Sequence, residues 1–256
     1  MSTYVSSDWH GNLWVWEYIK EILKPNDILY FLGDAADRGH DGWTIIKQLI
    51  DDKRVIYLKG NHEDLMVKAI GNSKLSLGDY YFNKDLELWY WNGGQVTHKE
   101  LINDNLSKDK KIEYLQKIKE LPFCCVYHNQ IGFDILLSHA GCDNMEDANE
   151  WPEKDFLWDR SHYLIANSWL GKDNEIIIHG HTPIPYLLKD QAYYTKSFKN
   201  DIIESYRHGA YWYAQGHKAC IDTGVIFTNE TVLLNLDTFE EIIIKKGDDK
   251  NENHKL

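Results

Sequence analysis

The stretch DILYFLGDAADRG, residues 27–39, joins a continuous apolar run to a loop of aspartates and glycines. A continuous apolar run of this length indicates a strand that is buried on both faces. On either side of it, stretches with helical periodicity alternate with β-like runs, the former at 12–24, 43–50 and 62–70 and the latter at 3–7 and 54–58. This β-α-β-α-β-α order predicts an α/β fold with a mainly parallel central sheet.

The alternation stops after residue 70. Residues 72–121 contain the aromatic cluster Trp89-Tyr90-Trp91, then Asn92-Gly93-Gly94 and two amphipathic stretches, so we expect a helical insertion there. A second insertion is expected at 189–218. The remaining β-like runs predict further strands at 123–127, 131–138, 175–178, 219–222, 225–228 and 232–236. We therefore expect a single domain over residues 1–246, followed by a polar tail at 247–256.

The composition argues against several classes of protein. With 28 Lys and Arg against 40 Asp and Glu in 256 residues, the net charge is −12, which repels a phosphate backbone and argues against binding to duplex nucleic acid. No apolar run approaches the roughly 20 residues of a membrane helix. The N-terminus lacks the basic start of a secretion signal. The four cysteines show no CxxC spacing, which is typical of reduced thiols, so we expect a cytoplasmic protein without a membrane partner.

Polar residues beside glycines follow five of the expected strands. The five stretches are Ser7-Asp8-Trp9-His10-Gly11-Asn12, the GDAADRG loop at 33–39, Gly60-Asn61-His62-Glu63, Ser138-His139-Ala140-Gly141 and His179-Gly180-His181-Thr182. Ligands of open α/β sheets bind outside the carboxyl ends of the strands, so we expect these loops to converge on one site. Aspartate, asparagine and histidine donors suit Mn, Fe, Zn or Mg. If one carboxylate bridges, two metals can be held by Asp8, His10, Asp34, Asn61, His139 and His181.

The ordered motifs DxHG, GDxxDRG, GNHE, SHAG and HGHTP extend from Asp8 to Pro183 and resemble those of the calcineurin-like metallophosphoesterases. Within them the chain is most similar to the phage and bacterial branch of the phosphoprotein phosphatases, which includes lambda phosphatase-like and diadenosine tetraphosphatase-like enzymes. Leu157-Trp158-Asp159-Arg160 and Ile221-Asp222-Thr223-Gly224 also resemble that branch. The resemblance implies a central β-sandwich flanked by helices.

The resemblance also implies a dinuclear metal centre. Asp8, His10 and Asp34 would hold the first ion. Asp34 would bridge to a second ion, whose remaining ligands would be Asn61, His139 and His181. Manganese is the expected metal, with iron, zinc and magnesium as alternatives.

Four further residues take roles by the same resemblance. Arg38 and Arg160 would grip the free oxygens of the phosphate. His62 would protonate the leaving oxygen, and Asp37 would orient its imidazole. A hydroxide that bridges the metals would attack phosphorus in line with the leaving group. The implied partner is a phosphorylated peptide or small molecule.

Several functions remain open. The first is hydrolysis of phosphomonoesters, as by a serine/threonine protein phosphatase, and the alternative is symmetrical cleavage of dinucleoside tetraphosphates. A catalytically silent phosphate-binding module ranks lower, because His62, Arg38 and the metal donors are all present. A phosphodiesterase or nuclease also ranks lower, because two arginines suit a terminal phosphate with three free oxygens.

Some residues allow a plainer interpretation. His179 is expected to be a strand residue or to support a ligand rather than to bind metal. Trp89 to Trp91 are expected to pack a helix rather than to stack a nucleobase. Tyr211 to Tyr213 could form an aromatic lid or an ordinary strand or loop. Arg160 could pair with Asp159 on the surface instead of binding phosphate.

Overall fold

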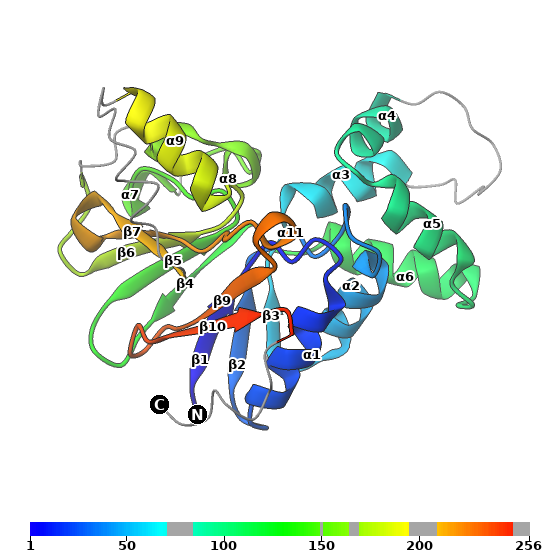
Figure 1. The fold of residues 1–256 in the computed structure, drawn as a ribbon, viewed down its shortest axis with the longest axis horizontal. Coiled ribbons are helices and arrows are strands. Elements are labelled where there is room, and N and C mark those ends of the chain that lie inside the picture. Colours follow the sequence, from blue (N-terminus) through cyan, green and yellow to red (C-terminus); the bar gives the residue numbers. More distant parts are fainter. Residues whose placement is uncertain (71–83, 149–150, 164–168, 195–208, 248–256) are drawn as a thin grey trace.

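Two mixed β-sheets form the centre of the molecule (Figure 1). The computed structural model describes residues 1–70, 84–148, 151–163, 169–194 and 209–247. The first sheet has the order β10-β9-β1-β2-β3, with β1 Thr3–Ser6, β2 Ile28–Phe31, β3 Val55–Tyr57, β9 Glu230–Asn235 and β10 Glu241–Lys245. The second has the order β4-β5-β6-β8-β7, with β4 Cys124–His128, β5 Asp134–Ser138, β6 Glu175–His179, β7 Tyr211–Tyr213 and β8 Lys218–Cys220.

The two sheets face each other across one apolar layer. Val5 and Leu32 from the side of the first sheet lie in the same buried cluster as Ile135 and Ile178 from the second. Each Å² of apolar surface that is buried stabilises the folded state by about 25 cal/mol, so this layer is a main contribution to the stability of the fold. The β-sandwich flanked by helices, which the family resemblance implies, is therefore confirmed.

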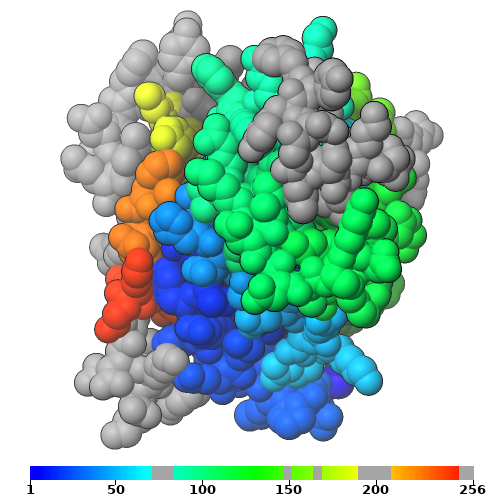
Figure 2. All heavy atoms as spheres, turned by 90° about the vertical axis from the view of Figure 1, so that its right-hand side faces the viewer, coloured from blue at the N-terminus to red at the C-terminus, as the bar shows by residue number. Residues whose placement is uncertain are grey.

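Helices cover the outer face of the first sheet. Buried side chains of these helices, such as Trp16, Ile46 and Met66, pack on Leu29 and Phe31 of β2. The helices are α1 Leu13–Ile22, α2 Gly42–Asp51, α3 Asn61–Ile70, α4 Lys84–Trp91, α5 Gln95–Asn103 and α6 Lys108–Lys119. Figure 2 shows α4 to α6, in green, on the face turned to the viewer.

Shorter helices accompany the second sheet. These are α7 Met145–Ala148, α8 Asp155–Trp158, α9 Ile184–Tyr194 and the three-residue 3-10 helices η1 Ser161–Tyr163 and η2 Ala214–Gly216. Ile184 and Leu187 of α9 pack against Tyr213 and Cys220 of the sheet. Among the described residues, none of the helices has the length and apolar character needed to span a bilayer.

The predicted mainly parallel sheet is present only in part, because both sheets are mixed and the parallel part of the first consists of β1, β2 and β3. Strands β1, β2 and β3 are parallel neighbours, with Thr3 opposite Ile28 and Leu29 opposite Val55. The expected pairing of 123–127 with 131–138 is also present, as the antiparallel pair β4 and β5. Helices α4 to α6 occupy the described part of the expected insertion at 72–121, and residues 71–83 lie outside the described residues.

One predicted strand is wrong. Residues 225–228 form a short helix, α11 Val225–Thr228, which directly follows Gly224 and is capped by Asn229. A short apolar run cannot be assigned to strand or helix from its periodicity alone, and here the hydrogen bond from the Gly224 amide to Asp222 turns the chain into a helix. The sequence interpretation also left out β10, the edge strand that pairs antiparallel with β9.

The boundaries of the predicted domain stay a prediction. Residues 195–208 of the second expected insertion and 248–256 of the expected tail lie outside the described residues. Tyr211 to Tyr213 form the edge strand β7, paired antiparallel with β8, so the strand interpretation of this aromatic stretch holds rather than the lid.

Candidate active site

The five loops meet at the carboxyl ends of β1, β2, β3, β5 and β6. Strand β1 rises from the N-terminus at the lower edge of Figure 1, and its loop pairs with the loop of β2 through hydrogen bonds from the Asp8 amide to Gly33 O (3.0 Å) and from the His10 amide to Asp34 O (2.9 Å). A Cβ atom on Gly180 would lie 2.0 Å from Asp8 Oδ2, so only glycine lets the loop of β6 approach this carboxylate.

Six of the ten predicted site residues have a left-handed backbone. Their φ angles lie between 42° and 70°, and they are Asp8, His10, Asp34, Asp37, Arg38 and His181. This conformation costs a non-glycine residue about 1–2 kcal/mol. Such strain persists only where the surrounding structure holds it, and it gathers at functional sites. Here all six strained residues belong to the predicted site.

Asp34 lies at the middle of this cluster. Its Oδ1 is 3.4 Å from His139 Nε2, and its Oδ2 is 3.7 Å from the Nε2 atoms of both His10 and His62. Two groups of side chains offer donor atoms that all lie within 4.8 Å of one another, and both include Asp34. The groups are His10 with Asp34 and His62, and Asp8 with Asp34 and His139.

Asn61, His139 and His181 form the other half of the cluster. Asn61 Oδ1 is 2.9 Å from His139 Nε2 and 3.0 Å from His181 Nδ1, and the two imidazole nitrogens are 3.2 Å apart. The backbone amide of His181 donates to the carboxylate of Asp8 at 3.1 Å. The structure thus brings together all six residues predicted as metal ligands.

The protonation of His139 fits a metal ligand. Burial lowers the pKa of His139 to about 3, so the ring is neutral near pH 7. Its Nδ1 lies 2.9 Å from the carbonyl oxygen of Leu32, which only accepts, so the ring proton belongs on Nδ1. The Nε2 lone pair therefore faces Asn61 Oδ1 and Asp34 Oδ1. These three acceptor atoms face one another with no proton between them, an arrangement that a bound cation would stabilise.

The charges of the other candidate ligands agree with this. Burial raises the pKa of Asp34 and of Asp8 well above the usual range, and the repulsion between these two carboxylates raises the pKa of Asp34 further. Burial also lowers the pKa of His10 and His181 well below the ordinary value. A divalent cation relieves both effects, because it stabilises ionised carboxylates and binds neutral imidazoles.

Arg38, Asp37 and His62 form a connected group at the edge of the cluster. His62 Nδ1 lies 2.7 Å from Asp37 Oδ2, and Arg38 Nη2 lies 3.1 Å from His62 Nε2. Arg38 Nη1 is 2.6 Å from His10 Nε2. A guanidinium group and an imidazole therefore stand side by side next to the candidate ligands.

Arg160 approaches from the loop after α8. Its Nε donates to His181 Nε2 at 3.3 Å. Asp159 does not pair with Arg160 here, because its carboxylate accepts hydrogen bonds from the Ser161 amide (3.1 Å), the Ser161 hydroxyl (2.9 Å) and the His162 amide (3.3 Å). The arginine is thus directed toward the cluster rather than toward its acidic neighbour.

His179 points away from the cluster. It is the last residue of β6, and its Nε2 lies 2.7 Å from the hydroxyl of Tyr213, which also reaches His162 Nδ1 at 3.1 Å. Burial lowers the pKa of His179 to about 4. This agrees with the expectation that His179 is a strand residue rather than a metal ligand.

Two buried carboxylates of the site were missed by sequence reasoning. Glu63 accepts hydrogen bonds from the amides of Asp34 (2.7 Å), Ala35 (2.9 Å) and Gly60 (2.9 Å), and so ties two loops together. Asp222 lies near Asp8, and burial raises the pKa of Asp222 to about 6. Both could have been found from the sequence, because Glu63 lies in the GNHE motif and Asp222 lies in the IDTG motif.

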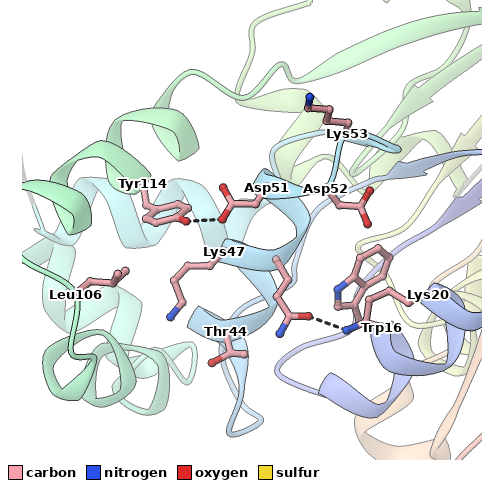
Figure 3. Close-up of a pocket in the computed structure, with 10 residues that line it drawn as sticks. Trp16, Lys20, Thr44, Lys47, Asp51, Asp52, Lys53, Leu106 and Tyr114 are labelled. Carbon is pink, nitrogen blue, oxygen red and sulfur yellow. Dashed lines mark hydrogen bonds between the residues drawn. The ribbon is translucent and has the colours of Figure 1, made fainter. Parts of the chain in front are cut away.

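A surface hollow of about 690 Å³ lies apart from this cluster, between α1, α2 and α6 (Figure 3). Two of its charged groups have partners within the lining, since Lys20 Nζ donates to Gln48 Oε1 at 2.9 Å and Asp51 accepts from the Tyr114 hydroxyl at 2.5 Å. Its lining contains none of the ten predicted site residues: it consists of Trp16, Lys20, Thr44, Lys47, Gln48, Asp51, Asp52, Lys53, Leu106 and Tyr114.

The fold is similar to that of two solved structures that are described as phosphatases. A "putative diadenosine tetraphosphatase" is similar with a TM-score of 0.55 and 14% identity, over 96% of this chain and 94% of that one. A protein serine/threonine phosphatase from Saccharomyces cerevisiae with similarity to human phosphatase PP5 has a TM-score of 0.52 and 14% identity, over 97% of this chain and 81% of that one. At this identity the likeness concerns the fold.

The family model for calcineurin-like phosphoesterases matches residues 1–220. The matched region contains all six candidate ligands, and members of this family use a dinuclear metal site. The chain therefore belongs to the calcineurin-like phosphoesterase family and is a phosphoric ester hydrolase.

Proposed function

We propose that this hydrolase is a metal-dependent phosphatase for phosphomonoesters, carried by phosphoserine or phosphothreonine peptides or by small molecules. The observation that carries the proposal is the position of two guanidinium groups at the metal-ligand cluster. Arg38 contacts His10 and His62, and Arg160 contacts His181. Planar guanidinium groups hold phosphate oxygens in pairs, and a terminal phosphate leaves three oxygens free for them.

The residues of the cluster fit two divalent ions, for which we propose manganese. Asp34 would be shared between both ions. Asp8 and His10 would complete the first set, and Asn61, His139 and His181 the second. Two ions at such a site polarise phosphoryl oxygens and lower the pKa of a bound water.

In this proposal, His62 would protonate the leaving group. Its Nδ1 is occupied by Asp37 Oδ2 at 2.7 Å, and the side chains of both residues are almost fully buried. The carboxylate fixes the ring and supports the positive charge of a doubly protonated imidazole. His62 Nε2 then faces the position beside Arg38 where a phosphate would bind. We therefore assign His62 to proton transfer, although its Nε2 also lies within reach of the first metal group.

Hydrolysis of an aryl phosphate tests the proposal. Excess chelator should abolish turnover, because it removes the metal ions that the six ligands would hold. Added Mn(II) should restore turnover. Full activity in excess chelator would contradict a metal-dependent mechanism.

A second candidate is symmetrical hydrolysis of dinucleoside tetraphosphates. The ring of Trp158 is 40% exposed and lies edge-on to His181, with ring centroids 6.0 Å apart, so its free face could stack on a base. The diadenosine tetraphosphatase-like neighbour supports the same candidate. Parallel assays with Mn(II) on a phosphopeptide, an aryl phosphate, nucleoside monophosphates and diadenosine tetraphosphate distinguish the two, and preference for the last would favour the alternative. Turnover of none of them would favour a silent phosphate-binding module.

We also propose a cytoplasmic location. Cys124, Cys125 and Cys220 have free thiols, which supports a reducing compartment.

A further inference from the structure

Asp37 and Arg38 are consecutive residues with left-handed backbones. Their φ angles are 70° and 67°, and each costs about 1–2 kcal/mol in this conformation. Asp37 orients the proposed proton donor, and Arg38 is a proposed phosphate ligand. Both side chains can act only if something holds this strained pair of residues in place.

A single segment from the helical region, residues 89–97, supplies three hydrogen bonds to the pair. The indole Nε1 of Trp89 donates to Asp37 Oδ2 at 2.8 Å. The amide of Asp37 donates to Thr97 Oγ1 at 2.8 Å, and the amide of Arg38 donates to the carbonyl of Gly93 at 3.3 Å. The end of α4, the following turn and the start of α5 therefore all contact the strained residues.

The carboxylate of Asp37 depends on Trp89. Its Oδ2 is shared by His62 Nδ1 at 2.7 Å and Trp89 Nε1 at 2.8 Å, while its buried Oδ1 finds no hydrogen-bond partner among the described residues. Without the indole, the carboxyl group would keep a single side-chain partner. It could then rotate about its Cβ–Cγ bond, and the imidazole would lose its fixed orientation.

Trp89 cannot contact a substrate, because its side chain is completely buried. It is held by Gly94, where a Cβ atom would lie 2.3 Å from the indole Nε1. This explains the second of the two glycines that follow the aromatic cluster in the sequence. Trp91, in the same cluster, is 88% exposed and takes no part in these contacts.

We propose that Trp89 is a positioning residue for the Asp37–His62 pair, supported by Thr97, so that the helical region serves catalysis by fixing the proton donor. The inference rests on the proposed function, because it assumes that His62 protonates the leaving group. Loss of this support should slow the reaction only when the leaving group needs a proton.

The variant Trp89→Phe tests the inference, and Trp16→Phe is its matched control. Both tryptophans are fully buried in the same hydrophobic cluster, but Trp16 Nε1 has no hydrogen-bond partner among the described residues. The kcat and KM of Mn(II)-loaded protein are measured with phenyl phosphate, whose leaving group needs a proton, and with 2,4-dinitrophenyl phosphate, whose leaving group does not.

For Trp89→Phe we expect kcat on phenyl phosphate to fall about tenfold with little change in KM, a fraction of the 10²–10⁴ that a general acid contributes. Turnover of the dinitrophenyl ester should stay within about twofold, and Trp16→Phe should resemble the wild type on both esters. An equal loss on both esters, or no loss beyond that of Trp16→Phe, would overturn the inference. A wild-type protein that hydrolyses neither ester would overturn the proposed function itself.

Substitutions of Thr97 give an independent readout should Trp89→Phe fail to fold. Thr97→Ser keeps the acceptor for the Asp37 amide, and Thr97→Val removes it with little change in volume. Only Thr97→Val should lower kcat selectively on phenyl phosphate. Equal kcat values for the two variants on this ester would overturn the supporting role of Thr97.

Discussion

Glu63 joins two loops of the site through four hydrogen bonds, all of which it accepts. Oε1 accepts from the Ala35 amide (2.9 Å) and the Tyr57 hydroxyl (2.9 Å), and Oε2 accepts from the amides of Asp34 (2.7 Å) and Gly60 (2.9 Å). In Glu63→Gln the side chain keeps its shape, but its NH₂ group must face two of these donors in either orientation.

The magnitude follows from the two bonds lost. Each hydrogen bond to a charged group contributes about 1.5–3 kcal/mol, and the donors left behind are buried, so Glu63→Gln should lower the free energy of unfolding by about 3–6 kcal/mol. That is a large share of the roughly 5–15 kcal/mol that stabilises a typical domain. Because the bonds hold the backbone of Asp34, the variant should also bind metal more weakly.

Urea unfolding in the presence of chelator measures this effect apart from metal binding. Glu113→Gln is the control, because Glu113 is exposed and its ion pairs within the described part of the chain are those with Lys110 and Lys117, so its loss should leave the unfolding midpoint almost unchanged. If Glu63→Gln unfolds at the same urea concentration and with the same m value as the wild type, Glu63 does not hold the loops together.

Three further outcomes are expected. His62→Asn should lower kcat on phenyl phosphate by about 10²–10⁴ with metal content unchanged, and loss of metal would contradict its role as proton donor. The folded-state pKa of His179, about 4, lies below its ordinary 6.5, so its stabilising contribution is present above pH 6.5 and lost as the pH falls to 4. The free energy of unfolding should therefore fall by about 3 kcal/mol more in wild type than in His179→Gln between pH 7 and pH 4, measured by urea titration in chelator, and equal losses would contradict this. Mn(II) at a hundred times its dissociation constant should raise Tm by about 5–10 °C over chelated protein, and equal Tm values would contradict a preformed site.

The convergence of the five loops was predictable from the sequence. Each motif follows an apolar run, and the parallel order of β1, β2 and β3 brings their carboxyl ends to one edge. For this reason Asp8, Asp34 and Asn61 could be placed together without knowledge of their contacts. Their roles in binding metal rest on resemblance and remain proposals.

Other features depend on tertiary contacts that local patterns do not contain. The apolar run at 225–228 fits a strand as well as a helix, and its helical form follows from the turn around Asp222 and Gly224. The indole of Trp89 reaches Asp37 across 52 positions of sequence, and no spacing rule links the two residues. Glu63 could be seen in the GNHE motif, but two of its four donors, the amides of Asp34 and Ala35, lie on residues that only the folded chain brings near.

Metal content tests the central claim most directly, because the whole account depends on a dinuclear centre built around Asp34. The protein is reconstituted with Mn(II), freed of excess ions and examined by elemental analysis beside Asp34→Asn. The account predicts about two manganese ions for each wild-type chain and a loss of both in the variant, since this carboxylate is common to both ligand groups. A wild-type protein that hydrolyses aryl phosphates with no metal bound, or an Asp34→Asn variant that retains two ions, would contradict it.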